Sequence, residues 1–121
     1  MVQETLGEFE QLALLAVVRL SNLGYGAAIQ QELERTANRS VSIATIYVTL
    51  VRLEKRGLAA SWLSDPTPVP GGKSRRFFRV TPEGAAALNA ARAVMNRMWT
   101  GLEGRDLSAR PGRVGVNTPF A

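Results

Sequence analysis

Hydroxyl and cationic side chains recur at helical spacing in the middle of the chain. Thr45, Thr49 and Arg52 are four and three residues apart, so a helix would project them from one face, with Lys55 and Arg56 at its end. Short polar groups and cations on an exposed helix face suit the major groove of B-DNA, and cations at a helix end suit its phosphates. The alternative is the ordinary solvated face of an amphipathic helix.

A second group of cations follows two glycines. Lys73, Arg75 and Arg76 come soon after Gly71 and Gly72, so they would lie near the tip of a turn. The guanidinium group matches phosphates and narrow minor grooves. A run of charges alone usually marks a solvated face, but its place after the polar-faced helix favours binding of duplex DNA by both segments together.

The composition excludes most catalytic chemistry. The 121 residues include no Cys and no His, which removes thiol nucleophiles, histidine acid–base chemistry, disulfides and the usual zinc or iron ligands. Ser, Lys and carboxylate side chains remain, but no pair of them shows a recognisable catalytic arrangement. We therefore expect no enzyme activity, no metal and no cofactor.

The net charge of +5 is concentrated in the middle of the chain. Residues 1–40 hold three Lys or Arg against five Asp or Glu (net −2), residues 41–80 hold seven against two (net +5), and residues 81–121 hold five against three (net +2). A basic centre after an acidic start indicates a face that binds a polyanion. The acidic start is unlike a signal peptide, and no apolar run approaches the roughly 20 residues of a membrane span. We expect a soluble, cytoplasmic protein.

Apolar periodicity predicts two helices before residue 40. The first, from Leu6 to Leu20, is ended by the turn residues of SNLGYG. Its expected inward side chains are Phe9, Leu12, Leu15 or Ala16, and Leu20. The segment AAIQQELERTA predicts the second helix, with Ile29 and Leu33 inward. Tyr25, between two glycines, is expected to pack between these two helices.

A third helix and a hairpin follow. Ser42 suits the N-cap of the helix, and Gly57 suits its end. Its inward residues at helical spacing are Ile43, Ile46, Tyr47, Leu50 and Leu53. The segments LAASWLS and SRRFFRV predict two strands, joined by the turn-rich DPTPVPGGK. Alternation places Phe78 and Val80 on the core side of the second strand and Phe77 on the other.

A last helix carries an apolar seam. Thr81 suits its N-cap, with Pro82 at the first helical position. Steps of three and four residues predict a dimer contact made by Leu88, Ala91, Met95, Met98 and Leu102. The alternative for Met95 and Trp99 is binding of a planar, apolar ligand. After Gly104 the sequence has no periodicity, which predicts a flexible tail.

The expected order of elements is helix, helix, helix, strand, strand, helix. This mostly α-helical fold with a small β-hairpin is a winged helix-turn-helix. We expect the DNA-binding domain over residues 1–80, the dimerisation helix over residues 81–103 and the tail over residues 104–121.

Three segments together resemble the PadR family of bacterial transcriptional regulators: LGEFEQLALLAVVRLSNLGYGAAIQQEL, SIATIYVTLVRLEKRGLAAS and GGKSRRFFRVTPEG. The similarity covers about residues 6–103. It implies a winged-helix domain that binds operator DNA as a homodimer, with the C-terminal helix, often joined by the first, at the dimer contact. It further implies repression that a small molecule releases.

The resemblance also assigns single positions. Tyr47 falls on the tyrosine of the family's recognition helix, Gly57 and Leu58 on the junction of helix and strand, and the segment TPEG, residues 81–84, on a T-x-E-G motif that starts the last helix. Phe78 stands where the family's wing usually has Tyr, so that hydroxyl is absent here. The single C-terminal helix is similar to the short branch of the family.

These observations predict a dimeric, sequence-specific DNA-binding repressor with an inverted-repeat operator. The expected DNA contacts are Ser42, Thr45, Tyr47, Thr49, Arg52, Lys55, Lys73, Arg75 and Arg76. A small apolar effector is the further partner expected at Met95 and Trp99. The alternative from another class is an RNA-binding or protein-interaction module that uses the same basic face.

Overall fold

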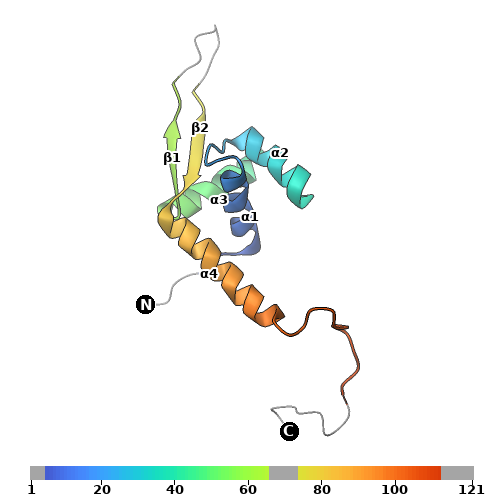
Figure 1. Cartoon of the computed structure of the whole chain (residues 1–121). Coiled ribbons are helices and arrows are strands. Elements are labelled where there is room, and N and C mark those ends of the chain that lie inside the picture. Colours follow the sequence, from blue (N-terminus) through green and yellow to red (C-terminus); the bar gives the residue numbers. More distant parts are fainter. Residues whose placement is uncertain (1–4, 66–73, 113–121) are drawn as a thin grey trace.

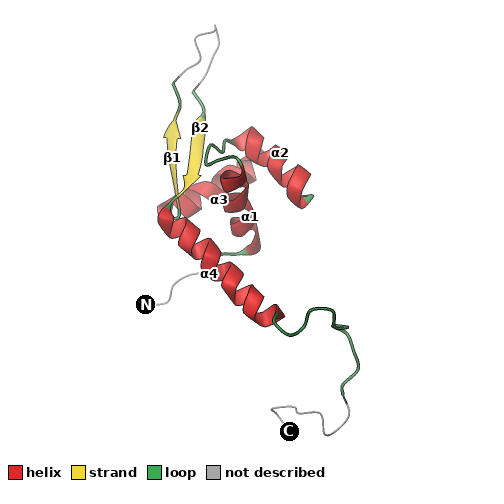
Figure 2. Cartoon of the chain, viewed as in Figure 1, coloured by secondary structure: helices red, strands yellow, loops and turns green. Residues whose placement is uncertain are grey.

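The structure, a computed structural model, describes residues 5–65 and 74–112 (Figure 1). Its elements are α1 (Glu8–Arg19), α2 (Gly26–Ala37), α3 (Ile43–Lys55), β1 (Ala59–Leu63), β2 (Arg76–Val80) and α4 (Pro82–Trp99). The two strands form an antiparallel hairpin beside the first three helices (Figure 2). The predicted order of elements and the winged-helix fold are confirmed.

Local capping explains where α3 and α4 begin. Ser42 Oγ accepts a hydrogen bond from the Thr45 N–H at 3.1 Å, and Thr81 Oγ1 accepts one from the Gly84 N–H at 3.0 Å. Each bond satisfies an N–H group that has no partner within its own helix. Gly57 follows α3 with a φ of 79°, a left-handed conformation that glycine adopts without strain.

The core lies between the first three helices and the inner face of the hairpin. Phe78 of β2 is its largest fully buried side chain, as strand alternation predicted. The helices contribute the buried residues Leu14, Val17, Ile29, Leu33, Ile46, Leu50 and Leu53. The core thus fixes the position of α3 from one side and leaves its other side uncovered.

The structure decides between two alternatives for the inward face of α1 and corrects the expected burial of Ile43. Of the alternatives Leu15 and Ala16, the structure buries Ala16 and leaves Leu15 44% exposed. Because α1 is apolar on most of its circumference, periodicity did not define a single inward face. Ile43 is 40% exposed, since it is the first residue of α3 and its side chain lies beside Gly26 at the start of α2.

The hairpin is joined to the turn between α1 and α2. Its register pairs Ser61 with Phe78 and Trp62 with Phe77. Gly24 exchanges two backbone hydrogen bonds with Phe78, of 2.7 and 3.2 Å, and the Asn22 side chain accepts a bond from the Val80 N–H at 2.9 Å. The base of the wing is therefore held along the outer edge of β2. The predicted turn tip with Gly71, Gly72 and Lys73 lies outside the described residues.

The start of α4 lies tightly against the junction of α3 and β1. A Cβ on Gly84 would lie 2.0 Å from the carbonyl oxygen of Leu58, so only glycine allows this approach. Ala87 and Leu88 pack partly on the core, and the rest of α4 extends away from the other helices (Figure 1). No helix in the described part of the chain is long and apolar enough to cross a membrane.

Candidate nucleic-acid interface

The outward side of α3 presents a hydroxyl, an apolar group and two cations. Thr45, Val48, Arg52 and Lys55 are all exposed, and they follow one another at steps of three and four residues, so they share one strip of the helix. Two hollows, of about 340 and 350 Å³, lie along this strip, and both are lined by Val48 and Arg52. We call these four residues the α3 strip.

The cap of α3 also orients the first polar group of the strip. Besides accepting from the Thr45 N–H, Ser42 Oγ donates to Thr45 Oγ1 at 2.9 Å. Since the Thr45 oxygen accepts this bond, its own proton is directed away from Ser42 and can be donated to an acceptor outside the protein. Both residues are exposed, as expected of the predicted contacts.

Thr49 was expected to project outward beside Thr45, and this is wrong. Its side chain is in the buried class, with only 7% of the residue exposed, and its hydroxyl donates to the carbonyl oxygen of Thr45 at 2.9 Å. The buried face of α3 includes Ile46, Leu50 and Leu53, and Thr49 lies at the edge of that face. A hydroxyl that bonds its own helix is no longer free to read a base.

Tyr47 has a mixed position. Its ring packs edge-on against Phe78, with ring centroids 5.6 Å apart, so it belongs partly to the core that holds the wing against α3. It also lines the hollow at the C-terminal end of the α3 strip, together with Val51 and Lys55. Tyr47 therefore links the position of the wing to that of α3.

The two arginines at the start of β2 lie on opposite faces of the hairpin, although the sequence suggested one common role. The Arg75 guanidinium lies over the Tyr25 ring, 4.4 Å from its centroid, and the residue is exposed. Arg76 Nη1 instead donates to Ser61 Oγ at 2.8 Å, and Ser61 Oγ lies 2.9 Å from both carboxylate oxygens of Glu54 on α3. Arg76 thus connects the wing to α3, whereas Arg75 faces solvent.

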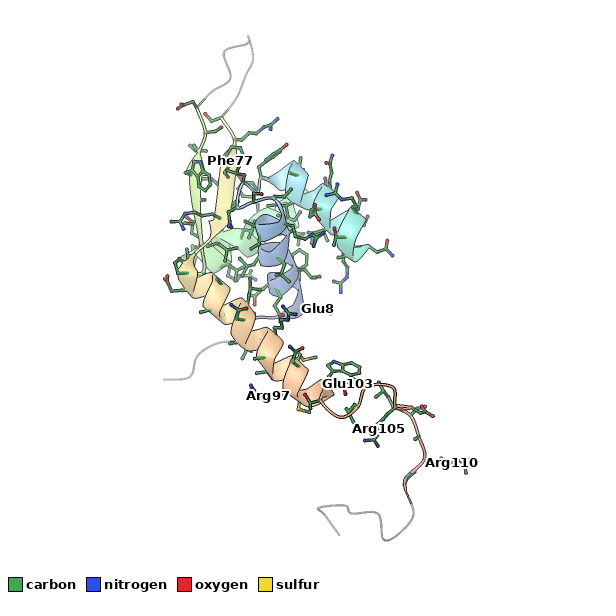
Figure 3. All side chains as sticks on the ribbon, in the orientation of Figure 1. Glu8, Phe77, Arg97, Glu103, Arg105 and Arg110 are labelled. Carbon is green, nitrogen blue, oxygen red and sulfur yellow. The ribbon has the colours of Figure 1, made fainter. Side chains whose placement is uncertain are left out.

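An aromatic ladder supports Arg75. Trp62 and Phe77 are stacked, with centroids 5.7 Å apart, and Phe77 meets Tyr25 edge-on at 5.6 Å, beside the first turn of α2 (Figure 3). The expectation that Tyr25 packs between the first two helices was wrong, because its ring packs on the wing instead. Alternation along β2 correctly predicted that Phe77 points away from the core. Its contact with Tyr25, from the turn between α1 and α2, had no local signal in the sequence.

A buried carboxylate, missed in the sequence, joins α1 to α2. Glu32 is only 3% exposed; it accepts hydrogen bonds from Thr36 at 2.5 Å and from Arg19 at 2.8 Å, and it is also paired with Arg35. The Thr36 hydroxyl, followed by Arg19, holds the pKa of Glu32 below its usual value against the opposing effect of burial. The spacings from Glu32 to Arg35 and to Thr36, three and four residues on the same helix, were the local signals in the sequence.

The predicted dimer residues divide into two groups. Leu88 packs partly on the chain's own core, and Ala91 is half-buried, whereas Met95 and Met98 are 55% and 70% exposed. Leu102 is not part of the helical seam as expected, because α4 ends at Trp99 and Leu102 lies in the turn beyond it.

The exposed end of α4 carries more apolar side chains than the two methionines of the predicted seam. Val94 and Trp99 are exposed together with the two methionines. Met95 and Trp99, the expected ligand residues, are four residues apart and so share one open face of the helix. In the described ranges, no group of three or more His, Cys, Asp or Glu residues is placed to hold a metal ion.

The comparisons with known proteins agree with this fold. The model of the transcriptional regulator PadR-like family matches residues 14–90. Transcriptional regulator Rv3488 of Mycobacterium tuberculosis is 42% identical over 74 residues, which are 61% of this chain and 64% of that protein. The chain thus spans a little less than two thirds of the length of that relative.

Solved structures show the same architecture. A PadR family transcriptional regulator from Eggerthella lenta is 28% identical, with 78% of this chain and 82% of that chain covered and a TM-score of 0.61. A PadR family transcription regulator from Clostridium difficile is 22% identical, with 76% of this chain and 93% of that chain covered and a TM-score of 0.57. At this identity the similarity is one of fold alone.

Proposed function

The chain belongs to the PadR-like family of transcriptional regulators, and from that premise we propose that it is a sequence-specific binder of double-stranded DNA. The α3 strip enters a major groove and reads base edges, and the wing lies along the adjacent phosphates or minor groove. The chain acts as a homodimer and represses transcription.

The observation that carries the proposal is the pair of free cations on the α3 strip. Arg52 and Lys55 are exposed, and no described residue forms an ion pair or hydrogen bond with either side chain. The other side of the same helix is held by the core through Ile46, Leu50 and Leu53. A rigid helix with uncompensated cations and a donor hydroxyl on its open side has the chemistry of a groove-binding element.

The dimer part of the proposal rests on the exposed end of α4. Val94, Met95, Met98 and Trp99 together place a large apolar surface in water, and pairing with the same surface of a second copy would remove it. Two copies related by a two-fold axis would place their α3 strips in successive major grooves, about 34 Å apart. The operator is therefore an inverted repeat, and occupancy of it excludes other proteins.

The effector part depends on the same pairing. Met95 and Trp99 lie on an open helix face of a single chain, so a planar, apolar molecule would be enclosed only where two α4 helices meet. Such a molecule would alter the angle between the two domains and, with it, the distance between the two strips.

Selection of bound duplexes from random DNA, at a stated salt concentration, tests the proposal. We expect enrichment of an inverted repeat with about one turn between half-site centres. Arg75→Ala should weaken binding to all sequences alike and reduce the slope of log affinity against log salt by about 0.9, the value for one phosphate contact. Arg92→Ala, at an exposed arginine of α4, is the matched control and should leave the slope unchanged.

The competing class is tested in the same assay. Structured RNA is added as a competitor of the selected duplex, and we expect it to displace little of the protein. Absence of any enriched duplex, or stronger binding of the RNA, would overturn the proposal in favour of an RNA-binding or protein-interaction module.

A further inference from the structure

Val48 is an apolar side chain at the centre of a polar strip. It is 57% exposed, more than Ile43 at the start of the same helix. It lies three residues after Thr45 and four before Arg52, so all three point to the same side of α3. It also lines both hollows on the strip. The isopropyl group therefore projects between a hydroxyl and a guanidinium rather than into the core.

The major groove offers one apolar group, the 5-methyl of thymine. Donor and acceptor groups on the other base edges gain nothing from a valine side chain, and they lose hydration beside it. We propose that Val48 contacts the 5-methyl group of a thymine in each half-site and is a specificity-determining residue. This inference rests on the proposed function, and it adds to it the identity of one base.

The order of the three side chains places that thymine. At about 1.5 Å of rise per residue, Val48 lies roughly 4.5 Å along α3 from Thr45 and roughly 6 Å from Arg52. Base pairs are spaced by about 3.4 Å. If the axis of α3 follows the groove, the thymine lies one or two base pairs from the base that Thr45 contacts, on the side towards the base or phosphate that Arg52 contacts.

The test removes the methyl group from the DNA and the isopropyl group from the protein. The duplex selected by the wild-type chain is prepared with each thymine replaced in turn by deoxyuridine, which lacks only the 5-methyl group. Each half-site should contain one thymine whose single replacement weakens wild-type binding about fourfold, the change that burial of one methyl group gives. For Val48→Ala, thymine and deoxyuridine duplexes should bind within about twofold of each other, because the methyl contact is already lost.

Matched controls separate this contact from general effects. Val18→Ala removes the same groups from an exposed valine of α1 and should retain the full discrimination between thymine and deoxyuridine. Far-UV circular dichroism checks that both variants keep the helical fold, which we expect since both side chains are largely exposed.

Two outcomes would overturn the inference. If every deoxyuridine replacement left wild-type affinity unchanged, no methyl contact exists. If the fourfold loss persisted in Val48→Ala, another residue makes the contact. Either result would leave duplex binding itself intact, whereas failure to select any duplex would overturn the proposed function and this inference together.

Discussion

At the scale of single residues, Glu32 shows how a charged group is tolerated in a small core. Its carboxylate is buried between α1 and α2, and it is bonded by Thr36, Arg19 and Arg35. A buried charge without partners would be strongly destabilising. Here the partners come from both helices, so the cluster ties α2 to α1 and fixes the platform against which α3 packs.

Glu32→Gln should lower the thermal unfolding midpoint at pH 7, since a neutral amide cannot replace a carboxylate that accepts from two arginines. The pKa of Glu32 is lowered in the folded state from about 4.5, so its stabilisation is fully present above that pH and is lost as the pH falls through the lower folded value. The difference in unfolding midpoint between variant and wild type, measured by circular dichroism, should therefore be larger at pH 7 than at pH 3.

Glu34→Gln is the matched control for this prediction. Glu34 is an exposed carboxylate on the same helix, and its replacement should change the midpoint little at either pH. A difference between Glu32→Gln and wild type that stayed the same from pH 7 to pH 3 would show that the charge of Glu32 does not stabilise the fold.

At the scale of elements, the wing is positioned from outside the hairpin. The turn between α1 and α2 pairs with β2 through Gly24 and Phe78, and Tyr25 from the same turn contacts both Phe77 and Arg75. A two-stranded hairpin alone is only marginally stable in water. The direction of the wing, and of the cation on it, is therefore set by the turn between α1 and α2 as much as by the strands.

Tyr25→Leu should weaken binding to the selected duplex about two- to fivefold, because the contact of a guanidinium with an exposed ring contributes about 0.5–1 kcal/mol. Tyr25→Phe keeps the ring and should bind as the wild type does. When Arg75 is already replaced by Gln, the further change Tyr25→Leu should not weaken DNA binding any more. A double-mutant cycle that compares the affinities and salt slopes of the four proteins measures this. Equal losses for Tyr25→Phe and Tyr25→Leu, or fully additive losses, would contradict this positioning role.

At the scale of the whole molecule, α4 has two parts with different tasks. Its first turns are fixed on the domain at Gly84, where the backbone approaches Leu58, and its last turns present Met98, which is 70% exposed. A rigid connection between the proposed DNA-binding domain and the proposed pairing surface means that a change at one alters the geometry at the other. The coupling proposed above between ligand, dimer and DNA would act through this connection.

Met98→Glu should convert the proposed dimer to monomer, since a carboxylate would be buried without a partner in the apolar contact. Sedimentation at several protein concentrations measures the molecular mass. The unfolding midpoint of the single chain should change little, because Met98 is exposed in the structure of one chain. Asn89→Glu adds the same charge at an exposed residue on the side of α4 opposite Met98 and should leave the dimer intact. A monomeric wild type, or equal effects of both variants, would contradict the pairing surface.

Much of this molecule was predictable because its signals are local. Ser42, Gly57 and Thr81 mark helix ends through bonds and backbone angles within a few residues, and each acts in the structure as predicted. Phe78 was placed in the core by strand alternation alone. Helical spacing likewise placed Thr45, Arg52 and Lys55 on one exposed strip. The family resemblance, confirmed by the match over residues 14–90, depends on the same local segments.

The remaining features depend on contacts between distant segments, for which one sequence holds no signal. Thr49 satisfied the spacing of the exposed strip, but the packing angle of α3 turned it towards the core. Arg75 and Arg76 are adjacent cations in the sequence. Only the packing of the hairpin, with one face on Tyr25 and the other bonded through Ser61 to Glu54 of α3, gave them different partners. Periodicity defines which side chains share a face; which neighbour covers that face, and at what angle, is a property of the packed molecule.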